Sequence, residues 1–468
     1  MTPENLKNRL AGAVAPFAEL FDCFEHAGFQ LYAVGGCVRD WCHGQTPKDI
    51  DFTTDATPPE TSQILAAHGM KVIPIGEAFG TIATLIGQKS YEITSFRVKE
   101  SYTRGSRHPR VRYGTDLIQD LERRDLTINA MAVSRDGTLI DPFDGAGDLA
   151  RGLLRVPRSS LERSAEIFRD DPLRILRLAR FLARLDFSVA PEATAAAKLC
   201  AASVLEVSHE RWFAELDGIL HAPHVTRAIA WLSETGVLGL LLPEIASLDL
   251  VSKSILTLSG DNRTMTDGTS LLAQTTSLVE ACHASGSSPW AAFLAYAGCM
   301  FTEDGNAATR VSQLLVTSIL MRLKVSNAFR DTTLRLVRPL PCGQPTKRAA
   351  RELAQTFLLD LPAWLKMLET RASLLPEETR AAEIERLHAW LDALSPWLDN
   401  PQAACITWPK DFSKTLAKEL GLQGKSLGLC LKFCADAVLD EDLSEHDDIA
   451  KIVLWAKKHF VPDDAYRV

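Results

Sequence analysis

The stretch that most constrains the fold is residues 31–54, where a short apolar run, a diglycine and two carboxylates follow one another. The apolar run 31–34 predicts a buried strand. Gly35 and Gly36 then let the backbone turn tightly and bring its N–H groups close to a ligand. A short helix predicted over 38–42 would point its positive end back at that turn, which favours phosphate binding.

Two carboxylates follow at Asp49 and Asp51. Because alternate side chains of a strand face the same side, a strand here would project both carboxylates together while Ile50 enters the core. Paired hard oxygen ligands beside a phosphate-binding turn are what Mg²⁺-dependent chemistry on a triphosphate requires. Each motif alone is more often a plain turn or a solvated strand end, so the hypothesis depends on their combination. The combination predicts catalytic and metal-binding roles for Asp49 and Asp51.

Glu92 lies on a further predicted strand, residues 91–97. An exposed strand face is the alternative interpretation of this residue. A third carboxylate from a neighbouring strand would complete a two-metal site, and the order of the elements makes Glu92 the best-placed candidate.

A polar group follows at Arg124, Asp125 and Asn129, ahead of an apolar run that we assign to the core. Arginine suits a triphosphate, whereas carboxylate and amide groups suit ribose hydroxyls. The alternative is a helix N-terminus with an acidic first turn. These residues alone leave both interpretations open.

A helix is predicted to begin at Asp171 and Pro172, a sequence typical of an N-capped helix start. Arg174, Arg177 and Arg180 recur every three residues along it. Arginines without acids one turn later repel each other, so an anionic partner would account for them. Asp171 beside Arg174 offers an acceptor and a donor, enough to address the edge of a cytosine or an adenine.

The remaining pattern predicts an α+β domain that ends near residue 150, with helices dominating beyond Leu161. Segment 208–215 predicts an N-capped helix that supports the preceding one. The further elements of the first domain are strands expected at 71–75, 80–86 and 132–140, and helices expected at 4–28 and 60–68.

A net charge of −8 argues against a generally basic RNA-coating protein, so any nucleic-acid surface must be local. Nine arginines within 151–184 supply such a surface. The 10 cysteines include no C-x-x-C pair and no Cys/His ligand spacing, so neither zinc nor a redox dithiol is predicted. The absence of a signal peptide and of a long apolar span predicts no membrane association and a cytoplasmic location.

Taken together, the motifs resemble the class II tRNA nucleotidyltransferases, the CCA-adding enzymes, which are relatives of the bacterial poly(A) polymerases. The resemblance covers roughly residues 30–220 and depends on several motifs that come in the family's order. They are Gly35-Gly36-x-Val38-Arg39-Asp40, Asp49-x-Asp51, Arg123-Arg124-Asp125-x-Thr127-x-Asn129-Ala130, Asp141-Pro142-Phe143-Asp144-Gly145, Asp171-Pro172-Leu173-Arg174 and Glu210-Arg211.

This resemblance implies a polymerase-β-like nucleotidyltransferase head over 1–150. All-α domains would follow, with a neck over 151–225, a body over 226–340 and a tRNA-binding tail over 341–468. The implied activity adds CCA, or its terminal A alone, to the 3′ end of tRNA from CTP and ATP without a nucleic-acid template. A poly(A) polymerase of the same family is the alternative.

The resemblance also implies Mg²⁺ on Asp49 and Asp51, with Glu92 as the third catalytic carboxylate. Asp171 and Arg174 would select the base. The body has no His-Asp pair at 292–300, so no phosphohydrolase activity is expected. The implied partners are the acceptor end and elbow of tRNA, and the oligomeric state is open. The nucleotide-binding residues implied are Gly35, Gly36, Arg39, Arg124, Asp125, Asn129, Asp171, Arg174, Arg177 and Arg180.

Overall fold

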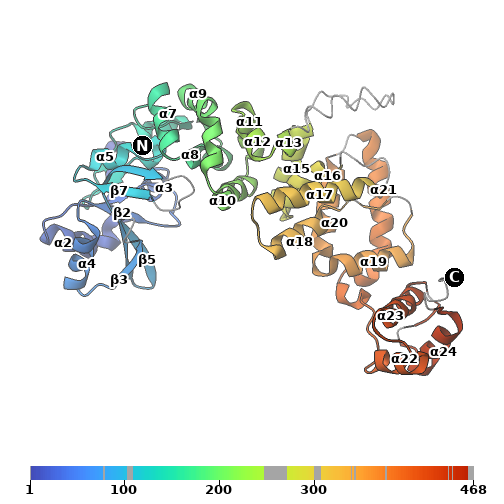
Figure 1. Ribbon diagram of the computed structural model, residues 1–468. Coiled ribbons are helices and arrows are strands. Elements are labelled where there is room, and N and C mark those ends of the chain that lie inside the picture. Colours follow the sequence, from blue (N-terminus) through green and yellow to red (C-terminus); the bar gives the residue numbers. More distant parts are fainter. Residues whose placement is uncertain are drawn as a thin grey trace. The chain divides into compact units, whose positions relative to one another are not determined.

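The computed structural model describes residues 2–76, 80–102, 109–246, 271–299, 307–338, 340–341, 344–374, 377–440, 442–444 and 446–461. The chain separates into two compact units, one of residues 1–283 with 318–325 and the other of 284–317 with 326–468 (Figure 1). Among the described residues, no helix combines the length and the apolar character needed to cross a bilayer. The boundaries expected near 150, 225 and 340 stay predictions.

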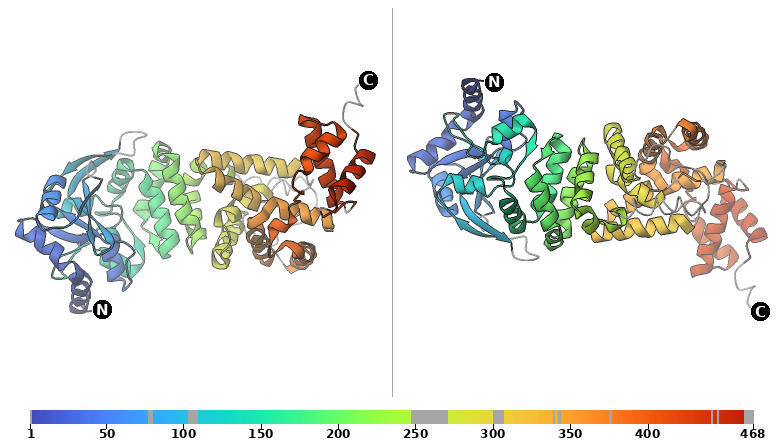
Figure 2. Two further views of the ribbon diagram at one scale, coloured as in Figure 1. Left: turned by 90° about the horizontal axis from the view of Figure 1, so that it is seen from below. Right: turned by 90° about the horizontal axis from the view of Figure 1, so that it is seen from above.

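A β-sheet lies in the N-terminal part of the first unit (Figures 1 and 2). It has seven strands in the order β3-β4-β5-β2-β1-β8-β9. Among its described strands, β2 and β5 are the only pair that run parallel. The mixed sheet, followed by a helical remainder, confirms the predicted α+β class. The strands are β1 (Leu31–Val34), β2 (Asp51–Thr54), β3 (Val72–Gly76), β4 (Thr81–Ile86), β5 (Lys89–Ser95), β8 (Ala132–Val133) and β9 (Leu139–Ile140); β6 (Arg97–Tyr102) and β7 (Pro109–Tyr113) form a separate hairpin.

Helices pack on this sheet through an aromatic core. Phe52, which is fully buried, contacts the rings of Phe17 and Phe21 edge-on, at centroid distances of 5.2 and 5.8 Å. A capping box of Thr57 and Glu60 starts α4, where Glu60 accepts the Thr57 N–H at 2.8 Å. The helices are α1 (Pro3–Val14), α2 (Ala18–His26), α3 (Gly36–Cys42), α4 (Pro58–Ala67), α5 (Leu117–Glu122) and α6 (Gly145–Arg151).

Two predicted elements of this domain are wrong in detail. The single helix expected over 4–28 is α1 and α2 joined by a 3₁₀ turn over Ala15–Phe17, where Pro16 lacks a backbone N–H for an α-helical bond. The strand expected over 132–140 is the hairpin β8–β9, because Gly137 turns the chain with φ = 80°.

Beyond the sheet, the first unit is helical, and α8 shows the pattern of a half-buried helix. Its apolar residues, such as Ile175 and Leu176, are fully buried, whereas Arg174 and Arg177 are partly exposed. Helices dominate beyond Leu161 as expected, with one short strand among them, β11 (Ser188–Val189), which pairs in parallel with β10 (Leu153–Leu154). The helices are α7 (Leu161–Asp170), α8 (Leu173–Leu185), α9 (Pro191–Cys200), α10 (His209–Leu220), α11 (Val225–Glu234), α12 (Val237–Leu241) and α13 (Pro243–Ala246).

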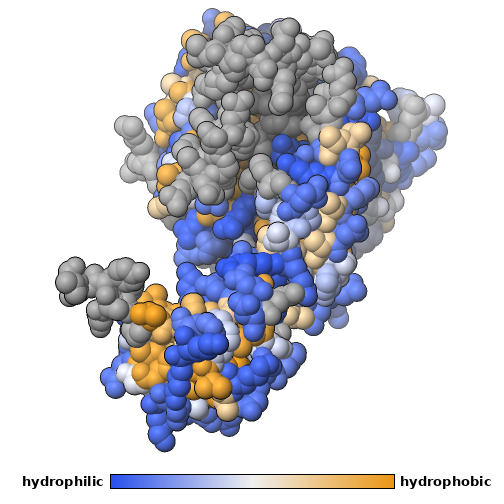
Figure 3. All heavy atoms as spheres, turned by 90° about the vertical axis from the view of Figure 1, so that its right-hand side faces the viewer, coloured by the Kyte–Doolittle hydropathy of each residue, from blue (hydrophilic) through white to orange (hydrophobic). Residues whose placement is uncertain are grey.

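Helices are the only regular secondary structure among the described residues of the second unit. Cys430 and Cys434 are fully buried in the core of its last three helices, so they pack there as small apolar residues. Apolar side chains also gather on the surface of these helices (Figure 3), and Leu454 there is 70% exposed. The helices of the unit are α16 (Pro289–Cys299), α17 (Ala307–Arg322, which runs into the first unit), α18 (Asn327–Leu336), α19 (Lys347–Phe357), α20 (Leu361–Ser373), α21 (Glu377–Leu394), α22 (Phe412–Leu420), α23 (Gly424–Leu439) and α24 (Ile449–His459).

Candidate active site

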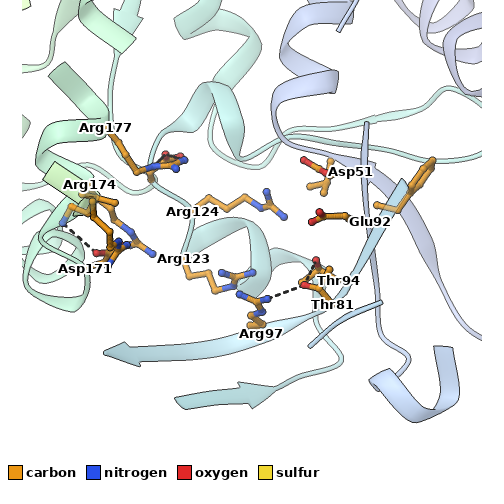
Figure 4. A pocket seen from close by; sticks show the side chains of 15 residues that line it. Asp51, Thr81, Glu92, Thr94, Arg97, Arg123, Arg124, Asp171, Arg174 and Arg177 are labelled. Carbon is orange, nitrogen blue, oxygen red and sulfur yellow. Dashed lines mark hydrogen bonds and ion pairs between the residues drawn. The ribbon is translucent and has the colours of Figure 1, made fainter. Parts of the chain in front are cut away.

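A pocket of about 400 Å³ opens in the first unit, between the sheet and α8. Six arginines and four carboxylates line it, so cationic groups predominate. In Figure 4, Asp51 and Glu92 lie at one side and Asp171, Arg174 and Arg177 at the other, with Arg123 and Arg124 between them. The lining residues are Val34, Asp51, Phe52, Thr81, Glu92, Thr94, Arg97, Arg123, Arg124, Asp125, Asp171, Leu173, Arg174, Arg177 and Arg211.

Asp51 and Glu92 lie opposite each other in the parallel pair of strands β2 and β5. Phe52, the next residue after Asp51, points into the core, so Asp51 faces the pocket. The surrounding protein atoms and the neighbouring Glu92 carboxylate raise the pKa of Asp51, even though its side chain keeps contact with solvent. Two adjacent carboxylates whose charges repel in this way form a donor set that suits a divalent cation.

The position of Asp49 differs from the predicted one. It precedes β2 and lies in no strand, because β1 ends at Val34, directly opposite Asp51. The alternation that was expected to align Asp49 with Asp51 therefore does not apply. Asp49 is exposed and does not line the pocket, although its charge contributes to raising the pKa of Asp51. Within the parts of the chain that the structure describes, no three metal-binding side chains cluster, and a ligand role for Asp49 stays a prediction.

The diglycine turn forms as predicted. Its backbone conformation and the nearby Arg124 side chain both favour glycine at position 35. Gly35 adopts φ = 83°, and its N–H donates to the carbonyl of Met131 at 3.1 Å. A Cβ atom at Gly35 would lie 3.1 Å from Nη1 of Arg124, so a larger residue would push against this arginine. Helix α3 then begins at Gly36.

Arg39 and Asn129 do not reach the pocket lining. The Arg39 side chain is buried and donates to Asn129 Oδ1 at 2.8 Å and to Asp40 at 2.7 Å. Asn129 in turn donates to Asp125 Oδ1 at 3.1 Å. Asn129 thus binds Asp125 directly, and Arg39 binds Asn129. A direct nucleotide contact for either residue stays a prediction.

Asp125 and Arg177 form a bidentate ion pair between the head and α8. The guanidinium donates to Asp125 Oδ2 through Nε at 3.0 Å and through Nη2 at 2.7 Å. Burial acts to raise the pKa of Asp125, but Arg177 and the Asn129 amide outweigh it and hold the pKa well below its usual range. The Asp125 carboxylate correspondingly raises the pKa of Arg177. Both residues line the pocket, and the pair fixes α8 to the segment that carries Asp125.

Asp171 combines the two interpretations of its motif. Its Oδ1 accepts the backbone N–H of Leu173 at 3.2 Å, which caps the start of α8. The same carboxylate lines the pocket beside Arg174 and pairs with Arg211 at 3.4 Å. Arg180 is different, since its Nε lies 3.1 Å from the buried Glu215 and it does not line the pocket.

Five polar lining residues were not among the predicted site residues: Thr81, Thr94, Arg97, Arg123 and Arg211. Thr81 and Thr94 face each other across β4 and β5 and bond through their hydroxyls at 3.0 Å, and Arg97 donates to Thr81 at 3.4 Å. This group depends on strand register, which no local motif encodes. The adjacent Arg123-Arg124 pair was a signal for Arg123. The helix of Arg211 was predicted only as support, and its ion pair with Asp171 shows a closer relation to the pocket.

Comparison with known families matches residues 31–155 to the poly A polymerase head domain and residues 186–248 to a probable RNA- and SrmB-binding site of polymerase A. The CCA-adding enzyme of Limosilactobacillus fermentum is 37% identical over 220 residues, which is 47% of this chain and 53% of that protein. The CCA-adding enzyme of Streptococcus suis is 35% identical over 239 residues, 51% of this chain and 57% of that protein. The chain thus spans about half the length of the curated relatives it matches.

Solved structures extend the likeness to nearly the whole fold. The crystal structure of the Bacillus stearothermophilus CCA-adding enzyme in complex with CTP superposes with a TM-score of 0.64 at 23% identity, covering 95% of this chain and 97% of that one. A CCA-adding enzyme in its apo form II gives a TM-score of 0.59 at 19% identity, covering 98% and 97%. At these identities the likeness establishes the fold alone.

Proposed function

Since the chain belongs, through its head, to the tRNA nucleotidyltransferase/poly(A) polymerase family, we propose that it builds CCA on the 3′ end of tRNA from CTP and ATP without a nucleic-acid template. The observation that carries this proposal is the layout of the pocket, in which Asp51 and Glu92 face arginines and the polar start of α8 lies at the far side. A nucleoside triphosphate spans such a site, with its phosphates near the acids and its base near α8.

The reaction requires the 3′-hydroxyl oxygen of tRNA to attack the α-phosphate while pyrophosphate leaves. Asp51 and Glu92, with Asp49 from the preceding segment, would hold Mg²⁺, which activates the hydroxyl and neutralises the pyrophosphate when bound. The chain's own contribution is position and charge. Arg123 and Arg124 lie next to the carboxylates and would bind the triphosphate oxygens, as arginine forks do with phosphate.

Base selection is proposed for Asp171 and Arg174. The carboxylate accepts and the guanidinium donates hydrogen bonds, which matches the mixed edge of a cytosine or an adenine. A base that left these groups unpaired would lose roughly 1–3 kcal/mol per group. Arg211, paired with Asp171, would hold the carboxylate toward the base.

We expect Arg174→Ala to reduce the preference for CTP and ATP over UTP and GTP by roughly tenfold, because one hydrogen-bond donor of the pocket lining is lost. Competition assays on tRNA substrates that end before C, or before A, would measure the preference. Arg184→Ala is the matched control, since Arg184 lies on the same helix but is exposed and does not line the pocket. Unchanged selection in Arg174→Ala would show that another group reads the base.

The proposed function is tested by incubating the protein with Mg²⁺ and tRNA that lacks its terminus, and by sequencing the product ends. CTP alone, ATP alone and both together should give CC, no addition and CCA. Addition of A only to tRNA already ending in CC would identify an A-adding enzyme, and long A tails on generic RNA would identify a poly(A) polymerase. Absence of any incorporation would refute the proposal.

The remaining assignments are proposals from the same family likeness. The helices beyond residue 340 would bind the tRNA elbow, and the reaction would take place in the cytoplasm. Segment 292–300, where no His-Asp pair stands, would have no phosphohydrolase role.

A further inference from the structure

Asp120 lies next to the pocket without lining it, and its carboxylate is completely buried. It is the fourth residue of the short helix α5. A buried carboxylate is stable only when other groups satisfy its charge and its lone pairs. The groups that do so here are mostly the residues that form the pocket.

Both oxygens of Asp120 bind arginines that line the pocket. Oδ1 accepts from Arg123 through Nε at 3.0 Å and through Nη2 at 2.5 Å, and Oδ2 accepts from Arg124 Nη2 at 3.2 Å. Burial acts to raise the pKa of Asp120, but these two arginines outweigh it and hold the pKa below its ordinary value. The carboxylate is therefore charged near neutral pH, where it acts as the counter-ion of both arginines.

The same carboxylate also binds β2, which carries Asp51, and the first residue of β6, which follows β5. Oδ1 accepts the backbone N–H of Arg97 at 3.1 Å, and Oδ2, at 3.4 Å, shares the hydroxyl proton of Thr53 with the Thr94 carbonyl at 3.0 Å. Thr53 follows Asp51 by two residues on β2, and Arg97 opens β6 directly after β5, which carries Glu92. One side chain thus connects the cationic middle of the pocket to its acidic wall.

We propose that Asp120 is a positioning residue, which holds Arg123 and Arg124 at a fixed place relative to Asp51 and Glu92 so that a nucleoside triphosphate meets preset cations. The proposal rests on the proposed function, because it assigns the triphosphate to these arginines. Arginine side chains held in place beforehand lose less rotamer freedom on binding, which improves affinity. Without Asp120 the two guanidinium groups would repel each other and leave this geometry.

Asp148 provides a matched control within the same domain. It is also completely buried, and it accepts hydrogen bonds from a threonine and two arginines. These are Thr127 Oγ1 at 2.6 Å, Arg151 Nη2 at 2.6 Å and Arg155 Nε at 2.9 Å, and none of the three lines the pocket. A purely structural role for Asp120 predicts that Asp120→Asn and Asp148→Asn behave alike.

The test titrates full-length wild type, Asp120→Asn and Asp148→Asn with CTP, and separately with inorganic tripolyphosphate, in the presence of Mg²⁺. We expect Asp120→Asn to bind both ligands about tenfold more weakly, and Asp148→Asn to stay within about twofold of wild type. Equal affinities in the two variants would overturn the proposal. If wild type itself binds no nucleotide, the proposed function fails instead, so the two failures are distinguishable.

A double-mutant cycle separates positioning from loss of stability. In an Arg123→Ala/Arg124→Ala background, Asp120→Asn should cause no further loss of affinity, because the residues through which it acts are absent. The same loss in both backgrounds would contradict the proposal. Should Asp120→Asn not fold, Arg123→Lys/Arg124→Lys keeps both charges but loses the guanidinium geometry, and about a tenfold loss is again expected. Wild-type affinity in that variant would equally overturn it.

Discussion

Asp51→Asn should abolish nucleotide addition, with a fall in rate of at least about 10³-fold, while tRNA affinity stays unchanged. The substitution keeps the size of the side chain and removes one of the two facing carboxylates. Because Asp51 faces the pocket from the first position of β2, the change leaves the buried Phe52 and the strand pairing in place. The loss should therefore appear in the chemical step, measured by single-turnover extension of labelled tRNA.

Three companion variants make this result interpretable. Glu92→Gln should cause a loss of similar size, since Glu92 lies directly opposite Asp51. Asp55→Asn is the control, because Asp55 follows β2 at its other end and accepts the Gln30 N–H at 2.7 Å away from the pocket. Asp49→Asn decides between its predicted role and its exposed position outside the pocket lining. Substantial extension by Asp51→Asn would remove this carboxylate from the mechanism.

Asp125→Asn should lower the free energy of unfolding of the first unit by about 3 kcal/mol at pH 7. This value is the low end for breaking a buried ion pair, because the Arg177 side chain keeps 37% of its surface exposed while Asp125 keeps 10%. The substitution removes the carboxylate charge that the Arg177 guanidinium binds directly and weakens the link between the head and α8. Urea unfolding followed by circular dichroism measures the change.

The pH dependence of this loss has a definite sign. Asp125 has a lower pKa in the folded than in the unfolded chain, so its stabilisation is fully present above its ordinary value and is lost as the pH falls toward the folded value. The gap between wild type and Asp125→Asn should thus be constant near neutrality and shrink below about pH 4. Asp186→Asn, which removes an exposed partner of Arg227, should show little change at any pH. A gap that does not vary with pH would show that charge is not what Asp125 contributes.

The sequence predicted the elements of the head well, because each has a local signature. The apolar run before Gly35 forms β1 and the capping box of Thr57 and Glu60 starts α4, so each of these signatures acts within a few residues. The errors lie where a partner strand decides. Asp49 was placed on a strand by alternation, but β1 ends opposite Asp51, and no feature of residues 49–51 marks that end.

Long-range pairing likewise explains what was missed around the pocket. Arg39 and Asn129 have side chains suited to a nucleotide, yet each bonds to the other in the interior, 90 positions apart. Nothing in the sequence around Asp120 distinguishes it from an exposed residue of a short helix. Its burial beneath two arginines depends on how α5 packs against β2 and β6. Motifs identify which chemistry a chain can hold, whereas tertiary contacts decide which of its polar residues reach the site.

The short parallel ladder of β10 and β11 has a consequence for how this chain can be cut. It joins Leu153 to Ser188 and Leu154 to Val189, so the intervening α7 and α8 form a loop that is closed at its base. A protease that nicks the backbone between Leu154 and Arg177 would leave the two fragments attached through the ladder and through the bond of Arg177 to Asp125. The nicked protein would keep both sides of the pocket together and would come apart only under denaturing conditions.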